Sequence, residues 1–244
     1  MIKLVENNEE ANLVLKHLSL DIAPLLAAKM FTEGFGVKQD FLQFYAAFND
    51  NGNLCAAFVK CNDRVFCLIE SLYDKEEILL FLNGFSDFKI FISSEFSSII
   101  KRDNFYVCNL MKKSLTQSRI NHAVSEIESK EFSNIIMQNN DRERYIRFFL
   151  NNSHLQRHGY LKNFAKHSSN SVVSIASVYS NKDQCYLCNV FTPLNFRNKG
   201  YATELINEIT EDGREYHLIC NESVSKLYNK CGFITYSKWI EFLY

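Results

Sequence analysis

The same order of secondary-structure elements is predicted twice along this chain of 244 residues. In the first half, residues 1–40 show the three- and four-residue apolar spacing of a helix, which Pro24 interrupts or restarts. Short β-type runs separated by turn-forming residues then predict antiparallel strands, and helices alternate with strands after them. The predicted strands are 44–48, 54–60, 64–70, 89–92 and 105–111, and the later helices are 74–82 and 96–102.

The second half follows the same order. Helical spacing over residues 121–149 precedes a second group of strands, and helices again alternate with the last strands. The predicted strands are 161–166, 172–179, 184–191, 215–220, 233–237 and 239–243, and the later helices are 201–210 and 223–230. When Phe105 is aligned with Phe233, residues 93–102 match residues 221–230 in their polar start and helical pattern.

This internal repeat predicts two related domains, residues 1–118 and residues 119–244. The junction is placed near residues 112–122, where residues 112–118 are mostly polar. The fold class that we expect is α/β (α+β), with each domain a mixed, mostly antiparallel sheet flanked by helices.

Composition narrows the classes of partner. Lys plus Arg number 27 and Asp plus Glu number 28, so the chain lacks the positive charge that binding to nucleic acid requires. The opening residues carry Glu6, Glu9 and Glu10 where a signal peptide would be basic and then apolar, and no stretch has the roughly 18 uninterrupted apolar residues of a membrane span. We therefore expect a soluble cytoplasmic protein that binds neither nucleic acid nor membrane.

The eight cysteines do not predict a disulfide framework or a metal site. They are dispersed along a chain that is long enough to bury a core. Cys185 and Cys188 form one isolated C-x-x-C pair inside a predicted strand, and no second pair or nearby His completes a zinc site. We expect no metal.

The segment most indicative of chemistry runs from Val190 to Thr203, between a predicted strand and a predicted helix. It contains the pattern R-x-x-G-x-A, formed by Arg197, Gly200 and Ala202. The glycine permits backbone conformations and a close backbone approach that a side chain would forbid. Consecutive N–H groups of the loop and of the helix start can then converge on a diphosphate.

This segment resembles motif A of the GNAT acetyltransferases, in which Arg or Gln is followed after two residues by Gly and after one more by Gly or Ala. Thr192-Pro193 precedes the pattern at the expected distance. Asn221, Tyr228 and Gly232-Phe233 have the spacing of the family's motif B. The resemblance covers residues 121–244.

A subset of the family is also similar to this chain. Residues 156–160 and 172–177 resemble two-part bacterial members, which have a divergent GNAT-like half at the N-terminus. In the N-terminal half, residues 73–77 lack glycine at the place of the diphosphate loop, and Ile100 and Ser93 stand where Tyr228 and Asn221 would be. The resemblance therefore implies a cofactor site in the C-terminal half alone.

The resemblance implies that the chain binds acetyl-CoA as cosubstrate and transfers the acetyl group to a primary amine by direct attack in a ternary complex. The strand residues would pair with the pantetheine arm, and the loop would surround the pyrophosphate. The implied cofactor residues are Val190, Phe191, Thr192, Arg197, Asn198, Lys199, Gly200, Tyr201, Ala202, Thr203, Asn221 and Tyr228.

Two of these residues have implied catalytic roles. The Val190 amide would face the thioester oxygen and stabilise its growing charge. Tyr228 would protonate the departing thiolate, because a phenol with a reference pKa of about 10 can protonate a thiolate whose reference pKa is about 8.5. Glu222, His158, His167 or a bound water could each serve as the base, so no base is assigned.

Other interpretations stay open at this stage. The chain could be a catalytically silent acyl-CoA-binding or regulatory module, or a globular domain without a coenzyme A site. Tyr228 alone could be a half-buried helix aromatic, and Glu204, Glu208, Glu211 and Asp212 are expected on a solvated helix face. The acceptor amine stays unidentified, and the sequence permits a homodimer without establishing one.

Overall fold

The structure is a computed structural model that describes residues 1–17, 23–37, 39–71, 74–114, 124–138, 140–180, 184–210 and 213–243. Contacts divide the chain into two compact units. Unit 1 comprises Met1–Leu110, Ile219–Ser223 and Thr235–Tyr244, and unit 2 comprises Met111–Leu218 and Val224–Ile234. The domain boundary predicted between residues 118 and 119 lies outside the described residues, so its position stays a prediction.

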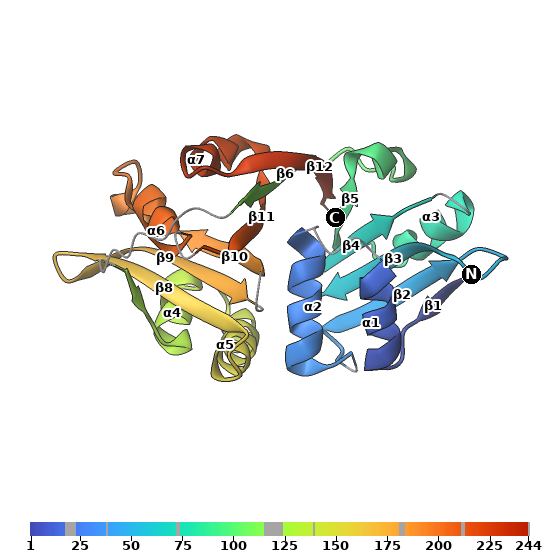
Figure 1. Cartoon of the computed structure of the whole chain (residues 1–244), viewed down its shortest axis with the longest axis horizontal. Coiled ribbons are helices and arrows are strands. Elements are labelled where there is room, and N and C mark those ends of the chain that lie inside the picture. Colours follow the sequence, from blue (N-terminus) through green and yellow to red (C-terminus); the bar gives the residue numbers. More distant parts are fainter. Residues whose placement is uncertain are drawn as a thin grey trace. The chain divides into compact units, whose positions relative to one another are not determined.

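Unit 1 contains a sheet with the strand order β1-β2-β3-β4-β5-β12 (Figure 1). Its neighbours are antiparallel except for the parallel pair of β4 and β5. The elements are β1 (Ile2–Leu4), α1 (Asn8–His17), α2 (Ala23–Phe35), β2 (Leu42–Phe48), β3 (Leu54–Cys61), β4 (Arg64–Ile69), α3 (Lys75–Asn83), β5 (Lys89–Ser93), the 3-10 helix η1 (Ser94–Ile99) and β12 (Ile234–Phe242). The strand β6 (Phe105–Lys113) continues from unit 1 into unit 2.

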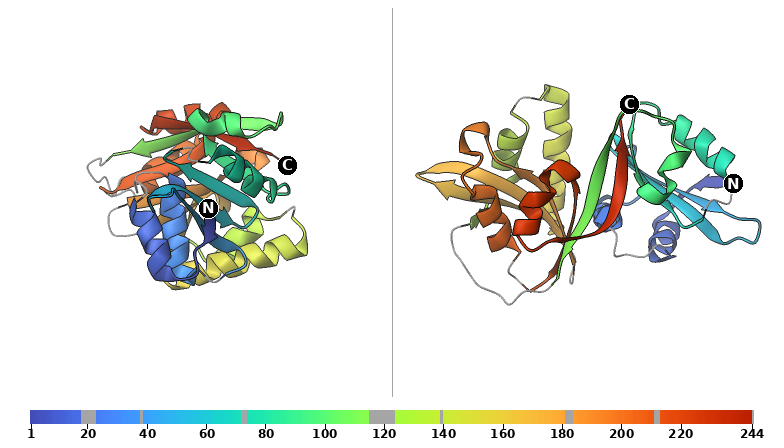
Figure 2. Two further views of the ribbon diagram at one scale, coloured as in Figure 1. Left: turned by 90° about the vertical axis from the view of Figure 1, so that its right-hand side faces the viewer. Right: turned by 90° about the horizontal axis from the view of Figure 1, so that it is seen from above.

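Helices cover both faces of the unit 1 sheet, and this explains why its central strand β3 is apolar from Leu54 to Val59. Alternate residues of β3 point to opposite faces, and Ala56 and Phe58 pack in one cluster with Ile78 and Leu82 of α3. The helices α1 and α2 lie side by side on the other face (Figures 1 and 2). A strand that is buried on both faces needs a continuous apolar run, as β3 has.

In unit 2 the strands are hydrogen-bonded in the order β11-β10-β9-β8-β7. Neighbouring strands are antiparallel except for the parallel pair of β10 and β11. The elements are β7 (Val124–Glu126), α4 (Ser129–Ile136), α5 (Arg142–Arg157), β8 (Leu161–Ser168), β9 (Ser171–Ser180), β10 (Gln184–Phe191), the 3-10 helix η2 (Leu194–Phe196), α6 (Tyr201–Ile209), β11 (Glu215–Asn221), the 3-10 helix η3 (Glu222–Val224) and α7 (Ser225–Lys230). Residues Ile219–Ser223, at the end of β11 and the start of η3, are counted with unit 1.

Two helix layers also enclose the unit 2 sheet. Helices α4 and α5 lie on one face and α6 on the other (Figure 2). Phe132 of α4 packs in one buried cluster with Ala165 of β8 and Ile175 of β9. Leu205 and Ile206 of α6 are fully buried as well. The sheet is therefore held rigidly at β9 and β10, from which the candidate site extends.

The two units share one element order, and the predicted fold class is confirmed. In each unit a short strand and two helices precede three antiparallel strands, and a helix then leads to a strand parallel to the third. The three-residue strands β1 and β7 were not predicted, because they are too short to show an alternating pattern. In the described part of the chain, no helix is long and apolar enough to cross a membrane.

Four predicted elements differ from the structure. The helix expected at 96–102 is the 3-10 helix η1 of Ser94–Ile99, and the helix expected from residue 223 begins as η3 before α7. The two strands expected after Phe233 are the single strand β12, because Lys238 does not interrupt the extended backbone. That strand pairs with β5 of unit 1, from Trp239↔Ser93 to Phe242↔Ile90.

Candidate active site

The strand β10 is paired with β11 over only part of its length. The parallel register runs from Gln184↔Glu215 to Tyr186↔His217. Among the described residues, no register pair joins Leu187–Phe191 to β11. Backbone N–H and C=O groups on that edge of β10 are therefore available to an extended ligand, which can add to the edge as a strand would.

A β-bulge lies within this unpaired part of β10. The antiparallel register with β9 shifts between Cys188↔Ser177 and Phe191↔Ile175, so Asn189 and Val190 together oppose one residue, Ala176. Asn189 has φ 53°, a left-handed conformation that asparagine tolerates better than most residues. The structure thus places Val190, the predicted amide donor, where the backbone leaves the regular ladder.

The loop after β10 is braced by its own side chains. The Nε of Arg197 donates to the Thr192 carbonyl at 3.0 Å, and the Thr192 hydroxyl lies 3.0 Å from the Ser174 hydroxyl. The Lys199 ammonium lies 5.8 Å from the centre of the Phe196 ring, within cation–π range. These contacts hold both predicted cations on an exposed loop whose conformation is set before any ligand binds.

The start of α6 offers a row of backbone donors. Asn198 has φ 61° and Gly200 has φ 86°, so the chain turns sharply into the helix. Gly200 is the N-cap and provides no side-chain acceptor, while its carbonyl accepts from the Glu204 N–H at 3.0 Å. In the described part of the chain, no backbone carbonyl accepts from the N–H groups of residues 198–203. Such a row of donors at a helix N-terminus suits a phosphate group.

The backbone conformation at position 200 requires glycine more than the space around it does. A Cβ added there would meet only Glu204 Oε1, at 3.7 Å. Its φ of 86° nevertheless lies in the region that side chains disfavour. The pattern R-x-x-G-x-A therefore marks a real turn, and the residues predicted for the diphosphate loop do lie together.

The corresponding region of unit 1 is closed to an anion. The register between β3 and β4 runs without a shift from Ala56↔Ile69 to Cys61↔Arg64. The helix α3 is capped by Asp74, whose carboxylate accepts from the Glu77 N–H at 2.8 Å. Glu76 and Glu77 add negative charge in the first turn. A phosphate would meet occupied donors and repulsion there.

Asn221 is the first residue of the motif B segment, and Tyr228 lies inside that segment. The Oδ1 of Asn221 accepts from the Ser223 N–H at 2.9 Å and so fixes the turn into η3. Tyr228 is a half-buried residue of α7, and its ring lies edge-on to Phe233 with the centres 6.1 Å apart. Its carbonyl accepts from the N–H groups of Cys231 and Phe233. The Gly-Phe pair thus ends the helix and fixes the tyrosine ring.

The three candidate bases lie on three separate segments, and all are exposed. His158 is the C-cap of α5, with its ring centre 4.4 Å from that of His154. His167 lies on β8, 3.4 Å from the Ser125 hydroxyl. Glu222 forms an ion pair with Lys238 at 2.9 Å. The structure gives no reason to prefer one of them.

The acidic face predicted on α6 is not wholly solvated. Glu204 is exposed, but the Glu208 side chain is only 12% exposed, so the expectation is wrong for Glu208. Both carboxylates contact the buried ammonium of Lys166 on β8, at 3.1 Å and 2.9 Å. Nothing in the sequence relates Lys166 to residues about 40 positions later. Glu211 and Asp212 lie outside the described residues.

A set of buried polar residues that reaches the bulge was not predicted from the sequence. Asn152, Asn163 and Ser177 are almost inaccessible, and Ser177 contacts Asn189. An asparagine at the end of a buried strand was the one available signal, because asparagine is frequent at positive φ.

The cysteines and histidines form no metal centre in the described residues, where no group of three or more His, Cys, Asp or Glu could hold an ion. All eight cysteines lie in that part of the chain, and none forms a disulfide. Cys185 is buried on β10 and Cys188 is half-buried in the same strand.

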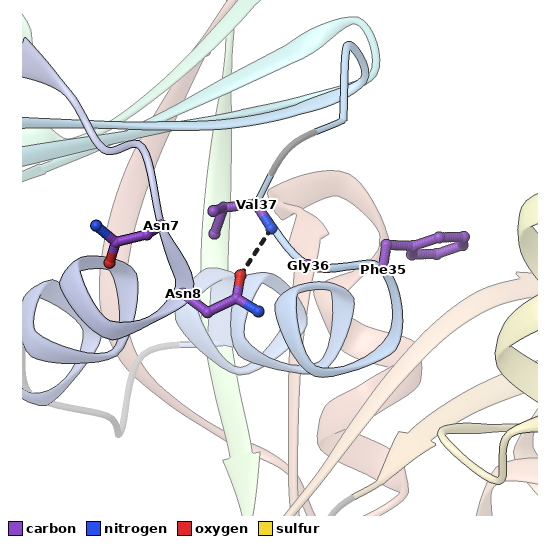
Figure 3. A pocket seen from close by; sticks show the side chains of 5 residues that line it. All are labelled: Asn7, Asn8, Phe35, Gly36 and Val37. Atoms are coloured by element: carbon purple, nitrogen blue, oxygen red, sulfur yellow. Dashed lines mark hydrogen bonds between the residues drawn. The ribbon is translucent and has the colours of Figure 1, made fainter.

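A pocket of about 320 Å³ lies between α1 and α2 of unit 1. The Asn8 Oδ1 accepts from the Val37 N–H at 3.0 Å there, and the Phe35 ring points away from that bond (Figure 3). Its lining is Asn7, Asn8, Phe35, Gly36 and Val37. None of the predicted cofactor residues lines this pocket.

Comparison with known families agrees with the geometry of unit 2. The sequence model of the acetyltransferase (GNAT) family matches residues 121–233. These residues form a GNAT domain. The match includes the bulge, the glycine loop and Tyr228, all of which belong to unit 2.

Solved structures show that the GNAT fold extends over the whole chain. An acetyltransferase of the GNAT family from Colwellia psychrerythraea is 12% identical and aligns with a TM-score of 0.61, over 99% of this chain and 98% of that one. A tandem GNAT protein from the clavulanic acid biosynthesis pathway is 9% identical, with a TM-score of 0.60 and the same coverage. Among curated protein sequences, none matches the chain.

Proposed function

We propose that the GNAT domain binds acetyl-CoA along the unpaired end of β10 and transfers the acetyl group to a primary amine. The observation that carries the proposal is the difference between two related helix starts. In unit 2 the helix after the third strand begins at Gly200 with uncapped N–H groups, whereas in unit 1 Asp74 caps the corresponding helix. Only the first arrangement suits a diphosphate.

The residues of unit 2 divide the cofactor among themselves. The edge of β10 from Leu187 to Phe191 would pair with the amides of the pantetheine arm. The N–H groups of residues 198–203 would bind the pyrophosphate, with Arg197 and Lys199 supplying positive charge.

The proposed reaction is direct attack of the neutral amine on the thioester carbon. A C–N bond forms, and the carbonyl oxygen gains the charge that the Val190 N–H stabilises. The C–S bond then breaks, and the thiolate takes a proton from Tyr228. The nitrogen that attacked loses one proton to water or to a base, and the Tyr228 phenolate regains a proton from water. The products are the N-acetylated amine and coenzyme A.

Two buried thiols, those of Cys220 and Cys231, are poorly suited to carry a covalent acetyl intermediate. Burial raises the pKa of Cys220 on β11 to about 11. Burial likewise raises the pKa of Cys231 to about 11, although the charge of Lys113 lowers it in part. Both thiols are protonated near neutral pH, and a thiol is a poor nucleophile. Direct transfer in a ternary complex is therefore the proposed route.

The role of Tyr228 is tested by the Tyr228→Phe variant in a thiol-release assay with a panel of polyamines, aminoglycosides, amino acids and peptide N-termini. We expect kcat to fall about 100-fold, because the general acid is lost. The dissociation constant for coenzyme A should change by no more than about twofold, since the phenol contributes mainly in the transition state. The matched control is Tyr160→Phe, which removes another half-buried phenol of unit 2 and should leave both values unchanged.

Three outcomes would contradict parts of this proposal. Unchanged turnover in Tyr228→Phe would remove the acid role. Coenzyme A binding without turnover for any amine would favour the silent binding module. Absence of coenzyme A binding would leave a globular domain without a cofactor site.

A further inference from the structure

Buried polar side chains cross unit 2 beneath the bulge of β10. Asn152 of α5 is 3% exposed, and Asn163 of β8 and Ser177 of β9 are both 0% exposed. All three lie on the sheet face that α4 and α5 cover. Burying so many polar groups is costly unless each one finds its partners.

Asn163 is the centre of this polar set, and every donor and acceptor of its amide is used. Its Oδ1 accepts from Ser177 Oγ at 2.9 Å and from Asn152 Nδ2 at 3.3 Å. Its Nδ2 donates to Asn152 Oδ1 at 2.7 Å and to Gln156 Oε1 at 3.2 Å. An amide with four partners has one orientation, so the Ser177 hydroxyl beside it is fixed as well.

The far end of the set is anchored to the backbone. Gln156 Nε2 donates to the Ile127 carbonyl at 2.9 Å, and its Oε1 also accepts from the Ser129 hydroxyl. The Ile127 N–H donates to the Asn163 carbonyl at 2.9 Å. The two helices α4 and α5 are thus tied to β8, and the polar set has little freedom to shift.

The near end of the set reaches the bulge. Ser177 is the β9 partner of Cys188 in the last regular register pair before the shift, and its Oγ accepts from Asn189 Nδ2 at 3.4 Å. Asn189 is the bulged residue with positive φ. The bond from its side chain therefore marks which residue of β10 is displaced from the ladder.

We propose that Asn163, Ser177 and Asn189 are positioning residues that fix the bulge and thereby set the direction of the Val190 N–H. This inference rests on the proposed function, in which that N–H stabilises the thioester oxygen. A bulge that moved by one residue would turn the Val190 amide to the opposite side of the strand, because successive residues alternate in direction. The polar set excludes that alternative by tying the side chain of Asn189 to a rigid partner.

Two variants break the chain of hydrogen bonds near the bulge. Ser177→Ala removes the hydroxyl between Asn163 and Asn189. Asn189→Gly keeps a residue that accepts positive φ and removes only the side-chain bond. The matched control is Ser133→Ala, since Ser133 is also 0% exposed, and its hydroxyl has no hydrogen-bond partner in the described part of unit 2.

The direct measurement is the amide resonance of Val190 in protein labelled with nitrogen-15, saturated first with coenzyme A and then with acetyl-CoA. In wild type and Ser133→Ala, we expect the Val190 signal to differ between the two ligands, because only acetyl-CoA carries the thioester oxygen that would accept from the Val190 N–H. In Ser177→Ala and Asn189→Gly this difference should disappear. With an accepted amine, kcat should fall at least about tenfold, while the dissociation constant for coenzyme A changes by less than about twofold.

The outcomes separate this inference from the proposed function. If wild type binds coenzyme A and both variants keep the Val190 difference, the positioning role is wrong and the proposed function stands. A lower melting temperature alone, with the Val190 difference and kcat retained, would make the polar set purely structural. If wild type binds no coenzyme A, the proposed function fails and the inference fails with it.

Discussion

Lys166 of β8 forms ion pairs with two carboxylates of α6. Its side chain is 10% exposed, and its ammonium lies 2.9 Å from Glu208 and 3.1 Å from Glu204. Glu204 belongs to the first turn of the helix that we propose to bind a diphosphate. Lys166 therefore neutralises a carboxylate that would otherwise oppose the ligand.

We predict that Lys166→Met lowers the free energy of unfolding by about 3 kcal/mol, because it leaves the mostly buried Glu208 without its cation. Chemical denaturation measures this difference. The matched control is Lys162→Met on the same strand, where the exposed pair with Glu126 should contribute at most about 1 kcal/mol. Equal losses in the two variants would contradict the account.

The contribution of Lys166 to the free energy of unfolding is predicted to depend on pH. Burial lowers the pKa of Lys166, but hydrogen bonds and charges from Glu208 and Glu204 together raise it above its ordinary value of 10.5. The folded state thus holds this proton more tightly than the unfolded state. The stabilisation is fully present below the unfolded pKa and is lost as the pH rises through the higher folded pKa. The difference between wild type and Lys166→Met should therefore be constant from pH 7 to 9 and shrink above about pH 10.4.

At this scale, the sequence predicted residues whose roles depend on local spacing. Gly200, Asn198 and Arg197 lie together because they are neighbours in one loop. The roles of Glu208 and Asn189 were not predicted, because their partners Lys166 and Ser177 are remote in sequence. A charge on an amphipathic helix normally faces water, and only the fold reveals a buried partner.

At the scale of elements, two related helix starts are used in opposite ways. The helix α3 satisfies its own donors with Asp74, which contributes about 1 kcal/mol to stability. The helix α6 begins at Gly200 and leaves its donors for a ligand. The helix α6 therefore lacks the stabilisation of a side-chain cap, and we attribute this difference from α3 to cofactor binding.

This contrast predicts the effect of charge at the start of α6. Gly200→Asn and Gly200→Asp place similar side chains on the same left-handed backbone, so their strain should be similar. Only aspartate adds a negative charge beside the proposed pyrophosphate. The dissociation constant for coenzyme A should therefore be at least about tenfold higher in Gly200→Asp than in Gly200→Asn at low ionic strength. Equal affinities would place the diphosphate elsewhere.

The elements themselves were largely predictable. Turn-forming residues separate the strands, and the predicted bounds of β10, 184–191, agree with the structure. The bulge could not be predicted, because hydrophobic alternation does not show which residue leaves the ladder. The 3-10 helix η1 was taken for a longer α-helix, since the apolar spacing of one turn is common to both.

At the scale of the whole molecule, the repeat seen in the sequence corresponds to two units of one topology. The short match of residues 93–102 with residues 221–230 was sufficient to predict it. The sequence did not reveal that the C-terminal strand β12 joins the sheet of unit 1, where Trp239, Ile240 and Phe242 are buried. Which strands a C-terminal strand pairs with depends on long-range packing, which apolar alternation does not encode.

The central claim is that one unit of the two binds the cofactor, and calorimetric titration with acetyl-CoA tests it most directly. The account predicts one acetyl-CoA bound per chain, and no binding heat in Gly200→Glu, whose carboxylate would occupy the start of α6. Absence of binding by wild type, two sites per chain, or unchanged affinity in Gly200→Glu would contradict it.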